Sequence, residues 1–290
     1  MKFKSSLENY FFVLPAVTIF AIFYIIPFIS VFQLSFYDWD GILPTKVFIG
    51  LSNFKEIFAD RIWWQSLWQS GYITLIALTF QNALAFLLAW ACDREIRMKH
   101  FYRVIFFIPP ILSEVVVGLV WQWILNGNYG ILNHWLVYFG FGDLTRNWLS
   151  DPNTALTTVA IVHCWKGFGW GFLLFLAGLQ TIPRELYEAA RVDGANAWNS
   201  FKNVTIPLMI PVVVLVGILT ILGTMQVFVL IYTMTGGGPG YHTEVPVLRI
   251  LASMRGSSRF GYACAQGITF GVILCMVSFA QYLINKKAKA

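Results

Sequence analysis

Charged residues are scarce in this 290-residue chain. Aspartate, glutamate, lysine and arginine together make up 12% of it, against about 25% in soluble domains. Hydrophobic residues make up 58%, and they occur in long runs rather than in a pattern that would fill one core. Length alone would suggest about two soluble domains, but the runs predict one bundle of membrane helices. The expected fold class is therefore all-α integral membrane.

Cysteine is also scarce, and its placement excludes two kinds of site. The chain has four cysteines, none is paired as C-x-x-C, and each lies in or beside an apolar run. Small buried side chains are the expected role for such residues. We therefore predict no metal site and no structural disulfide among Cys92, Cys164, Cys264 and Cys275.

Several catalytic and binding motifs are missing. No G-x-x-x-x-G-K-[ST] occurs, so the chain lacks the phosphate-binding loop of an ATP-hydrolysing unit. The chain also has no arginine-rich tract interleaved with aromatic residues, so nothing in the sequence indicates nucleic-acid binding. No aspartate lies inside an apolar run, so an intramembrane aspartyl enzyme is not indicated. We expect no catalytic residues and no cofactor bound by this chain.

Six apolar segments are long enough to cross a bilayer, which takes about 20 residues. Pro109-Pro110 near the start of the third segment predicts a kink, and the glycine-rich run 235–240 predicts a helix stop after the fifth. A short amphipathic helix is expected around 247–254. The predicted spans are residues 10–32, 67–91, 104–125, 154–179, 206–232 and 262–284.

The basic residues predict which side each connection faces. Lysine and arginine gather in the N-terminus (Lys2 and Lys4), the turn 93–103, the loop 182–205 and the lysine tail, so these are expected in the cytoplasm. Both termini are then cytoplasmic. The outer loop before the sixth span holds three arginines, but the opposite orientation would place more basic residues outside. The predicted parts are an N-terminal helix and first periplasmic loop (1–65), a transmembrane core (66–285) and a basic tail (286–290).

The polar stretch from Ile182 to Pro211 is more ordered than a simple connector requires. Its pattern predicts an amphipathic helix over 184–192, a break at Asp193-Gly194 and a second helical stretch. Thr205 is expected to cap the next helix, with Pro207 in its first turn. Such order indicates a loop that docks on a partner.

This stretch resembles the EAA loop of permease subunits of bacterial ABC importers. The motif appears as Glu188-Ala189-Ala190, then Gly194, then Ile206-Pro207-Leu208, with the proline directly after the isoleucine. Three further runs resemble the carbohydrate permeases related to the maltose transporter, and the resemblance extends over essentially the whole chain. They are F-I-G-L-S-N-F (48–54), F-Y-R-V-I-F-F-I-P-P (101–110) and F-V-L-I-Y-T-M-T-G-G-G-P (228–239).

The resemblance implies a type I importer permease in the bacterial inner membrane, with a carbohydrate as its substrate. It also implies three kinds of protein partner: a second permease, expected to form a heterodimer, a dimer of ABC ATPases that binds ATP and Mg²⁺, and a periplasmic or lipid-anchored solute-binding protein. The EAA helix would dock on the ATPase as a coupling helix. The residues expected to carry this contact are Arg184, Glu188, Ala189, Ala190, Arg191, Asp193 and Gly194.

Polar groups inside spans are costly and often mark a solute pathway. By this criterion Glu114, Gln81-Asn82 and the polar and tryptophan residues of spans four and five stand out. The contacts implied by the resemblance fall on almost the same positions, without Gln81-Asn82. The predicted pathway comprises Glu114, His163, Trp165, Lys166, Gly167, Trp170, Thr224, Gln226 and Val227.

Other interpretations of these residues stay open. Glu114 and Lys166 could pair with each other rather than bind solute, or Lys166 could bind a carboxylate or phosphate. The two tryptophans could be packing residues, and Gln81-Asn82 could join helices. A secondary transporter or channel is the alternative function, but it would need ion-coupling carboxylates, and only Glu114 qualifies. An intramembrane enzyme would need a catalytic pair, and His163 has no evident partner.

Overall fold

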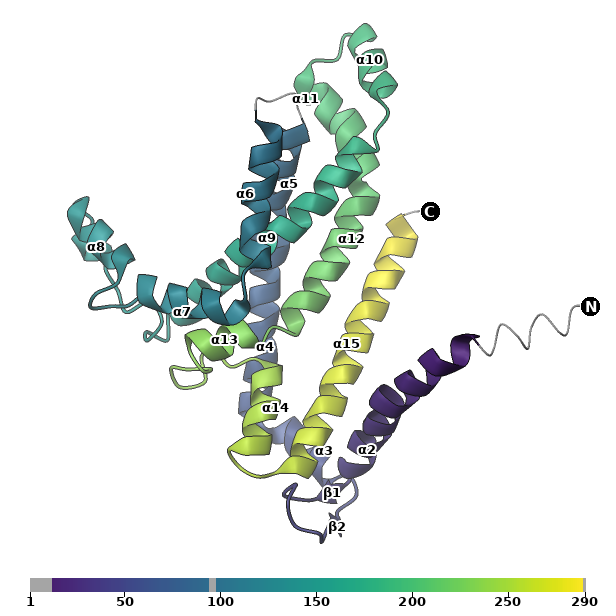
Figure 1. Cartoon of the computed structure of the whole chain (residues 1–290), viewed down its shortest axis with the longest axis vertical. Helices are drawn as coiled ribbons and strands as arrows, with labels where there is room; N and C mark the ends of the chain where they lie inside the picture. Colours follow the sequence, from purple (N-terminus) through teal and green to yellow (C-terminus); the bar gives the residue numbers. More distant parts are fainter. Residues whose placement is uncertain (1–11, 94–97, 289–290) are drawn as a thin grey trace, which may run out of the picture. The chain divides into compact units, whose positions relative to one another are not determined.

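The computed structural model describes residues 12–93 and 98–288, and the chain divides into two compact units. The first unit takes residues 1–63 and 249–275, and the second takes 64–248 and 276–290. Figure 1 shows both as mostly helical. The basic residues Lys2, Lys4, Arg94, Arg97 and Lys289 lie outside the described residues, so the predicted orientation of the termini stays a prediction.

The first unit begins with an apolar helix whose surface is almost wholly exposed. It runs from Phe12 to Leu34 and includes a π-helical turn, Ala21–Ile25, followed by α2, Ile26–Leu34. A short antiparallel hairpin follows, in which β1 (Tyr37–Asp38) pairs with β2 (Val47–Phe48). Helix α3 (Ser52–Ala59) comes next. The exposed apolar surface of the first helix suits lipid or another membrane subunit.

Ion pairs and hydrogen bonds join the end of α3 to the last part of the chain within the first unit. The Asp60 carboxylate accepts hydrogen bonds from Tyr262 Oη at 2.9 Å and from Arg249 Nη2 at 3.3 Å, and Glu56 makes a bidentate pair with Arg259. Burial alone would raise the pKa of Asp60, but the hydrogen bonds from Tyr262 and the Trp63 backbone, with the Arg249 charge, hold it below its usual value. Two of the three arginines of the predicted outer loop, Arg249 and Arg259, thus have structural partners.

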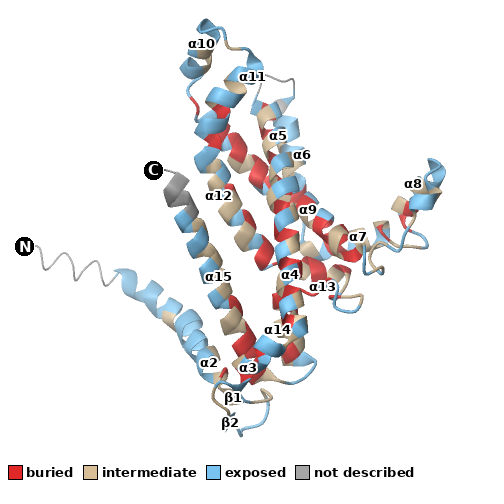
Figure 2. Ribbon diagram, turned by 180° about the vertical axis from the view of Figure 1, so that it is seen from behind, coloured by how far each residue is buried: buried red, intermediate tan, exposed pale blue. Residues whose placement is uncertain are grey.

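The second unit is built around one long buried helix, α9 (Ala155–Gln180). It packs against α5 (Asn82–Asp93), α6 (Lys99–Ile111) and α12 (Ile206–Met225). Figure 2 shows buried positions along much of α9. Helix α4 (Arg61–Ile76) continues into α5 through a π-helical turn, Ala77–Gln81, so that 61–93 form one element long enough to span a membrane.

The predicted third span is broken rather than kinked. Helix α6 ends at Ile111 and α7 (Glu114–Ile124) starts three residues later, at an angle of 94° to it. Pro109 and Pro110 lack the N–H groups that would continue the ladder, and Leu112 and Ser113 adopt extended backbone that ends the helix. The described chain therefore has five candidate spans, or six when the bent pair counts as one.

The polar stretch after α9 folds as expected up to Gly194. Helix α10 covers Arg184–Val192, and Gly194 has a φ of +81°, a conformation that glycine adopts without steric cost. The predicted cap at Thr205 is wrong. Helix α11 (Ala197–Ser200) runs through a π-helical turn, Phe201–Thr205, directly into α12. Thr205 is helical and buried, and its hydroxyl bonds to the hydroxyl of Tyr187 at 2.9 Å.

The fifth span ends earlier than predicted. Helix α12 ends at Met225, and a separate helix, α13 (Val229–Met234), follows before the glycine-rich stop. The expected amphipathic helix is α14 (Pro246–Arg255), and the last span is α15 (Phe260–Ala288). A further short helix, α8 (Ile131–Tyr138), lies in the connection between α7 and α9.

Candidate functional site

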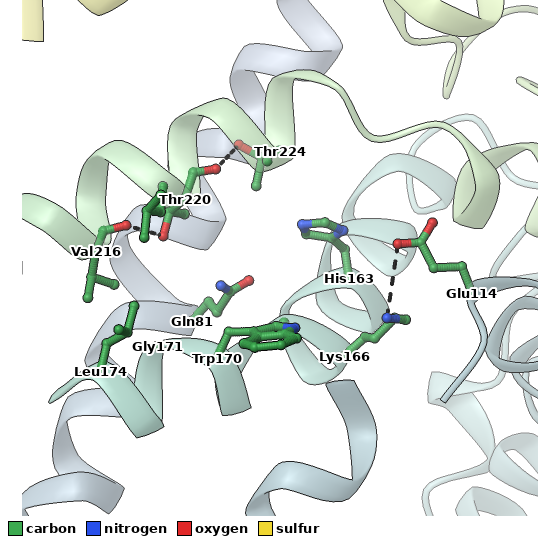
Figure 3. A pocket seen from close by; sticks show the side chains of 13 residues that line it. Gln81, Glu114, His163, Lys166, Trp170, Gly171, Leu174, Val216, Thr220 and Thr224 are labelled. Atoms are coloured by element: carbon green, nitrogen blue, oxygen red, sulfur yellow. Dashed lines mark hydrogen bonds and ion pairs between the residues drawn. The ribbon is translucent and has the colours of Figure 1, made fainter. Parts of the chain in front are cut away.

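A pocket of about 380 Å³ lies within the second unit, between α9, α12, the start of α7 and the π-helical turn before α5. Figure 3 shows the side chains that line it. Six of the nine predicted pathway residues belong to this lining: Glu114, His163, Lys166, Gly167, Trp170 and Thr224. The pocket therefore gathers residues from four separate segments of the sequence.

Helix α9 contributes one face to the pocket. His163, Lys166, Gly167 and Trp170 follow a spacing of three and four residues, which places them on one side of a helix. Trp165 does not share this side and does not line the pocket. Its ring instead packs edge to face against Trp121, with 5.5 Å between ring centroids, so of the two tryptophans only Trp170 is available in the pocket.

Helix α12 contributes a wall whose hydroxyl groups are engaged. Thr220 Oγ1 donates to the Val216 carbonyl at 2.8 Å or to Asn82 Oδ1 at 3.1 Å. Thr224 Oγ1 lies 2.8 Å from both the Thr220 carbonyl and Thr74 Oγ1. These bonds join α12 to the helix 61–93, so the threonines shape the wall and have little capacity left for a ligand.

Two predicted residues at the end of α12 lie elsewhere. Gln226 is the residue after the last turn of α12 and is exposed outside the pocket. Val227 is 6% exposed and belongs to an apolar cluster with Leu230 and Ile231. Because α12 stops at Met225, neither residue continues the pocket-facing side of the helix.

Lys166 and Glu114 lie next to each other in the lining of the pocket. The Lys166 ammonium lies 4.0 Å from Glu114 Oε1 and donates to the Pro110 carbonyl at 3.4 Å. The break after α6 leaves that carbonyl without an intrahelical partner, as at any helix end. The side chain of Lys166 is 14% exposed and that of Glu114 43%, so the pair balances the charge of the pocket while the carboxylate remains accessible.

The remaining side chains offer flat apolar surface and neutral hydrogen-bonding groups. Trp170 is 58% exposed and rests edge to face on Phe107. His163 is half-buried beside it, and Figure 3 shows its ring between Gln81 and the Glu114–Lys166 pair. Within residues 12–93 and 98–288, no group of three or more histidines, cysteines or acidic residues could hold a metal ion. The pocket is suited to binding a polar solute.

Sequence reasoning missed several lining residues, although a signal for them exists. The missed positions are small or aliphatic residues that continue the two helical faces at the same spacing. They are Gly171 and Leu174 on α9 and Val216, Leu219, Thr220 and Gly223 on α12. Gln81 also lines the pocket, whereas Asn82 joins helices through Thr220 as expected.

The predicted coupling residues form a separate exposed surface on α10 and the turn after it. Ala190 is half-buried, and the other six are exposed: Arg184, Glu188, Ala189, Arg191, Asp193 and Gly194. A methyl group at Gly194 would meet nothing within 4 Å. Figure 1 places α10 and α11 at one end of α9 and α12, and none of the seven residues lines the pocket.

The coupling surface is anchored in the same core as the pocket helices. Ile182, just before α10, packs in one apolar cluster with Leu179 of α9 and Met209 of α12. Tyr187 of α10 packs against this cluster and bonds to Thr205 at 2.9 Å. A displacement of α10 would therefore act on both pocket-lining helices.

Comparison with known proteins places the chain among transport components. A family model described as "Binding-protein-dependent transport system inner membrane component" matches residues 81–290. The probable ABC transporter permease protein YurN of Bacillus subtilis is 34% identical, over 99% of this chain and 98% of that protein. The trehalose/maltose transport system permease protein MalF of Thermococcus litoralis is 32% identical, over 83% and 81% of the two chains.

A solved structure shares the fold. A chain of the bacterial ABC transporter involved in the import of the acidic polysaccharide alginate superposes with a TM-score of 0.84, over 99% of this chain and 97% of that one. The two sequences are 22% identical. The expected all-α importer permease fold is confirmed by this likeness.

Proposed function

Because the chain belongs to the binding-protein-dependent transport system inner membrane components, a family of multi-pass membrane proteins, we propose that it is a permease subunit that imports a carbohydrate or sugar derivative. The relative named for trehalose and maltose transport supports this substrate class. The pocket supports it as well. Trp170 offers an exposed flat face to a sugar ring, and His163 and the Glu114 carboxylate offer hydrogen-bonding groups for hydroxyls.

The energy is proposed to come from a separate ATPase dimer that docks on α10. Ala189 is exposed on this helix, and its small side chain permits close approach of another protein. The charges of Arg184, Glu188 and Arg191 would fix the register of the contact. ATP and Mg²⁺ would bind to that dimer, while a solute-binding protein and a second permease complete the assembly.

One observation carries the proposal: the two helices that line the pocket and the entry to α10 pack in one apolar cluster. Trp170 lies about 15 Å along the helix axis from the end of α9 at Gln180. The core cluster of Leu179, Ile182 and Met209 then joins α9, the entry to α10 and α12. Closure of the ATPase dimer would move α10, and α9 and α12 would open the pocket to the other side of the membrane.

The test is substrate-stimulated ATP hydrolysis by the complete assembly in proteoliposomes. Replacement of Ala189 by Trp adds a large side chain to an exposed helical position, so the permease should fold while docking is blocked. We expect stimulated hydrolysis to fall about tenfold or more, as a loss of about 1.4 kcal/mol in the contact would give. Ala189→Ser keeps the small size and should retain hydrolysis close to the wild-type rate.

Two outcomes would count against the proposal. Wild-type stimulation in the Ala189→Trp assembly would remove α10 as the docking surface. Solute uptake by this chain alone, without ATPase or binding protein, would favour a secondary transporter or channel instead.

A further inference from the structure

Gln81 lines the pocket at the end of a π-helical turn. It is the last residue of the π-helical turn Ala77–Gln81 that joins α4 to α5. A π-helical turn inserts an extra residue into an α-helix, changes which residues face a given side, and is frequent at functional sites. Here the turn ends at the one residue of the helix 61–93 that lines the pocket.

The side-chain amide of Gln81 is buried but not fully bonded. The residue is 7% exposed, and its Oε1 receives no hydrogen bond from any described residue. A buried acceptor without a partner costs about 1–3 kcal/mol. Such a cost suggests that this group serves a ligand.

The neighbouring polar groups of the wall do not share this property. Asn82 Oδ1 accepts from Thr220 at 3.1 Å, and the hydroxyls of Thr74 and Thr224 lie 2.8 Å apart. These bonds already join the helix 61–93 to α12. Gln81 and Asn82 are adjacent in sequence, yet of their two side-chain oxygens only that of Asn82 is hydrogen-bonded to another helix.

The absence of a side chain at Gly167 leaves room for the side-chain amide of Gln81. A Cβ at this position of α9 would lie 2.7 Å from Gln81 Oε1 and 3.1 Å from Nε2. The glutamine side chain therefore rests against the bare backbone of α9, and a larger residue there would displace it. Figure 3 shows the amide of Gln81 directed to the same space as His163 and Trp170.

We propose that Gln81 is a solute-recognition residue whose side-chain oxygen accepts a hydrogen bond from a sugar hydroxyl in the pocket. This inference rests on the proposed function as a carbohydrate permease. The amide would select for a solute that carries a hydroxyl at this point, because an analogue without it would leave the acceptor unpaired. Specificity of this kind comes from buried polar groups that need a partner.

The test combines a variant with altered sugars. The assembly is first screened for uptake of maltose, trehalose, cellobiose, sucrose and raffinose into proteoliposomes, with the binding protein in saturating amount. Uptake of the best probe and of its monodeoxy analogues is then measured for wild type and Gln81→Leu. We expect Gln81→Leu to lower the uptake efficiency of the parent sugar about tenfold, as for one lost hydrogen bond. We also expect one deoxy analogue that wild type transports poorly to be transported by Gln81→Leu as efficiently as the parent sugar.

The control is Thr79→Val, on the same π-helical turn. Thr79 is exposed outside the pocket, and its hydroxyl bonds to the Leu75 carbonyl at 2.8 Å, so its replacement should leave uptake efficiency unchanged. Thermal unfolding of the sugar-free assembly gives a second readout. A residue that joins helices would lower the melting temperature when replaced by leucine, whereas a recognition residue should leave it equal or higher.

The possible failures are distinguishable. If wild type takes up none of the five sugars, the proposed function fails, and the inference fails with it. If wild type transports a sugar but Gln81→Leu does so with equal efficiency, or if every deoxy analogue loses the same factor in both proteins, only the role of Gln81 is overturned. A lowered melting temperature with unchanged discrimination would assign Gln81 to helix packing.

Discussion

Lys166 and Glu114 illustrate how a charge is tolerated inside a membrane protein. The ammonium has two partners, the Glu114 carboxylate at 4.0 Å and the Pro110 carbonyl at 3.4 Å. Since Glu114 is 43% exposed, solvent weakens the pair, and its net contribution is modest. The geometry favours mutual pairing, one of the two roles that the sequence left open for these residues.

A double-mutant cycle measures that pairing. Glu114→Gln and Lys166→Met should each lower the melting temperature, because each leaves the other charge without its counter-charge. The double variant should recover most of the loss, with a coupling energy of about 1 kcal/mol, and should retain uptake of a neutral sugar. Losses that simply add would contradict pairing. Uptake lost in every variant that lacks Lys166, the single variant included, would favour a direct role of Lys166 in binding the solute.

Helical spacing explains which pathway residues the sequence could identify. His163, Lys166, Gly167 and Trp170 lie three and four residues apart and line the pocket together, whereas Trp165 lies on another side of α9. Periodicity alone could have excluded Trp165. Gln226 and Val227 could not be excluded in this way, because their position depends on α12 ending at Met225, which no residue signal marks.

The helices themselves were largely predictable, and their irregularities were not. Apolar runs located every span, and Gly194 located the turn after α10. Pro109 and Pro110 indicated a kink, but the 94° break depends on how α6 and α7 pack on neighbouring helices. The π-helical turns Ala77–Gln81 and Phe201–Thr205 are also set by packing. The sequence singled out Gln81-Asn82 but could not tell which of the two lines the pocket, and Thr205 was wrongly predicted as a cap.

The contact between α6 and α9 offers a test of this packing. A Cβ at Gly169 would lie 2.6 Å from Pro110 Cγ and would overlap the Phe106 carbonyl oxygen. Gly169→Ala should therefore destabilise the protein by about 1–3 kcal/mol through overpacking. Gly223 lies in α12 with nothing within 4 Å of its Cβ position, so Gly223→Ala should be neutral or stabilise by up to about 1 kcal/mol.

Thermal unfolding in detergent compares the two variants. The account of the α6–α9 contact predicts a lower melting temperature for Gly169→Ala alone. Equal melting temperatures in both variants would mean that the helices can separate at little cost, and that the break after α6 does not depend on this contact.

For the whole molecule, the second unit holds the proposed solute pocket, the proposed docking surface on α10 and the packed helices that connect them. The family match covers residues 81–290, which include α9, α10 and α12. The orientation in the membrane stays a prediction from basic residues, several of which lie outside the described part of the chain. The central claim is that α10 controls which side of the membrane the pocket opens to.

Thiol accessibility tests that claim most directly. In a variant without the native cysteines, Gly223→Cys places a thiol in the pocket, and Gly71→Cys places one at an exposed position of α4 outside it. An impermeant maleimide is added to either side of membranes that contain the full assembly. We predict that Cys at 223 is labelled from the ATPase side without nucleotide and from the opposite side with ATP and vanadate, while labelling at 71 does not change. Ala189→Trp should abolish this change in labelling. In the assembly that keeps Ala189, labelling at 223 that is the same with and without nucleotide would contradict the claim.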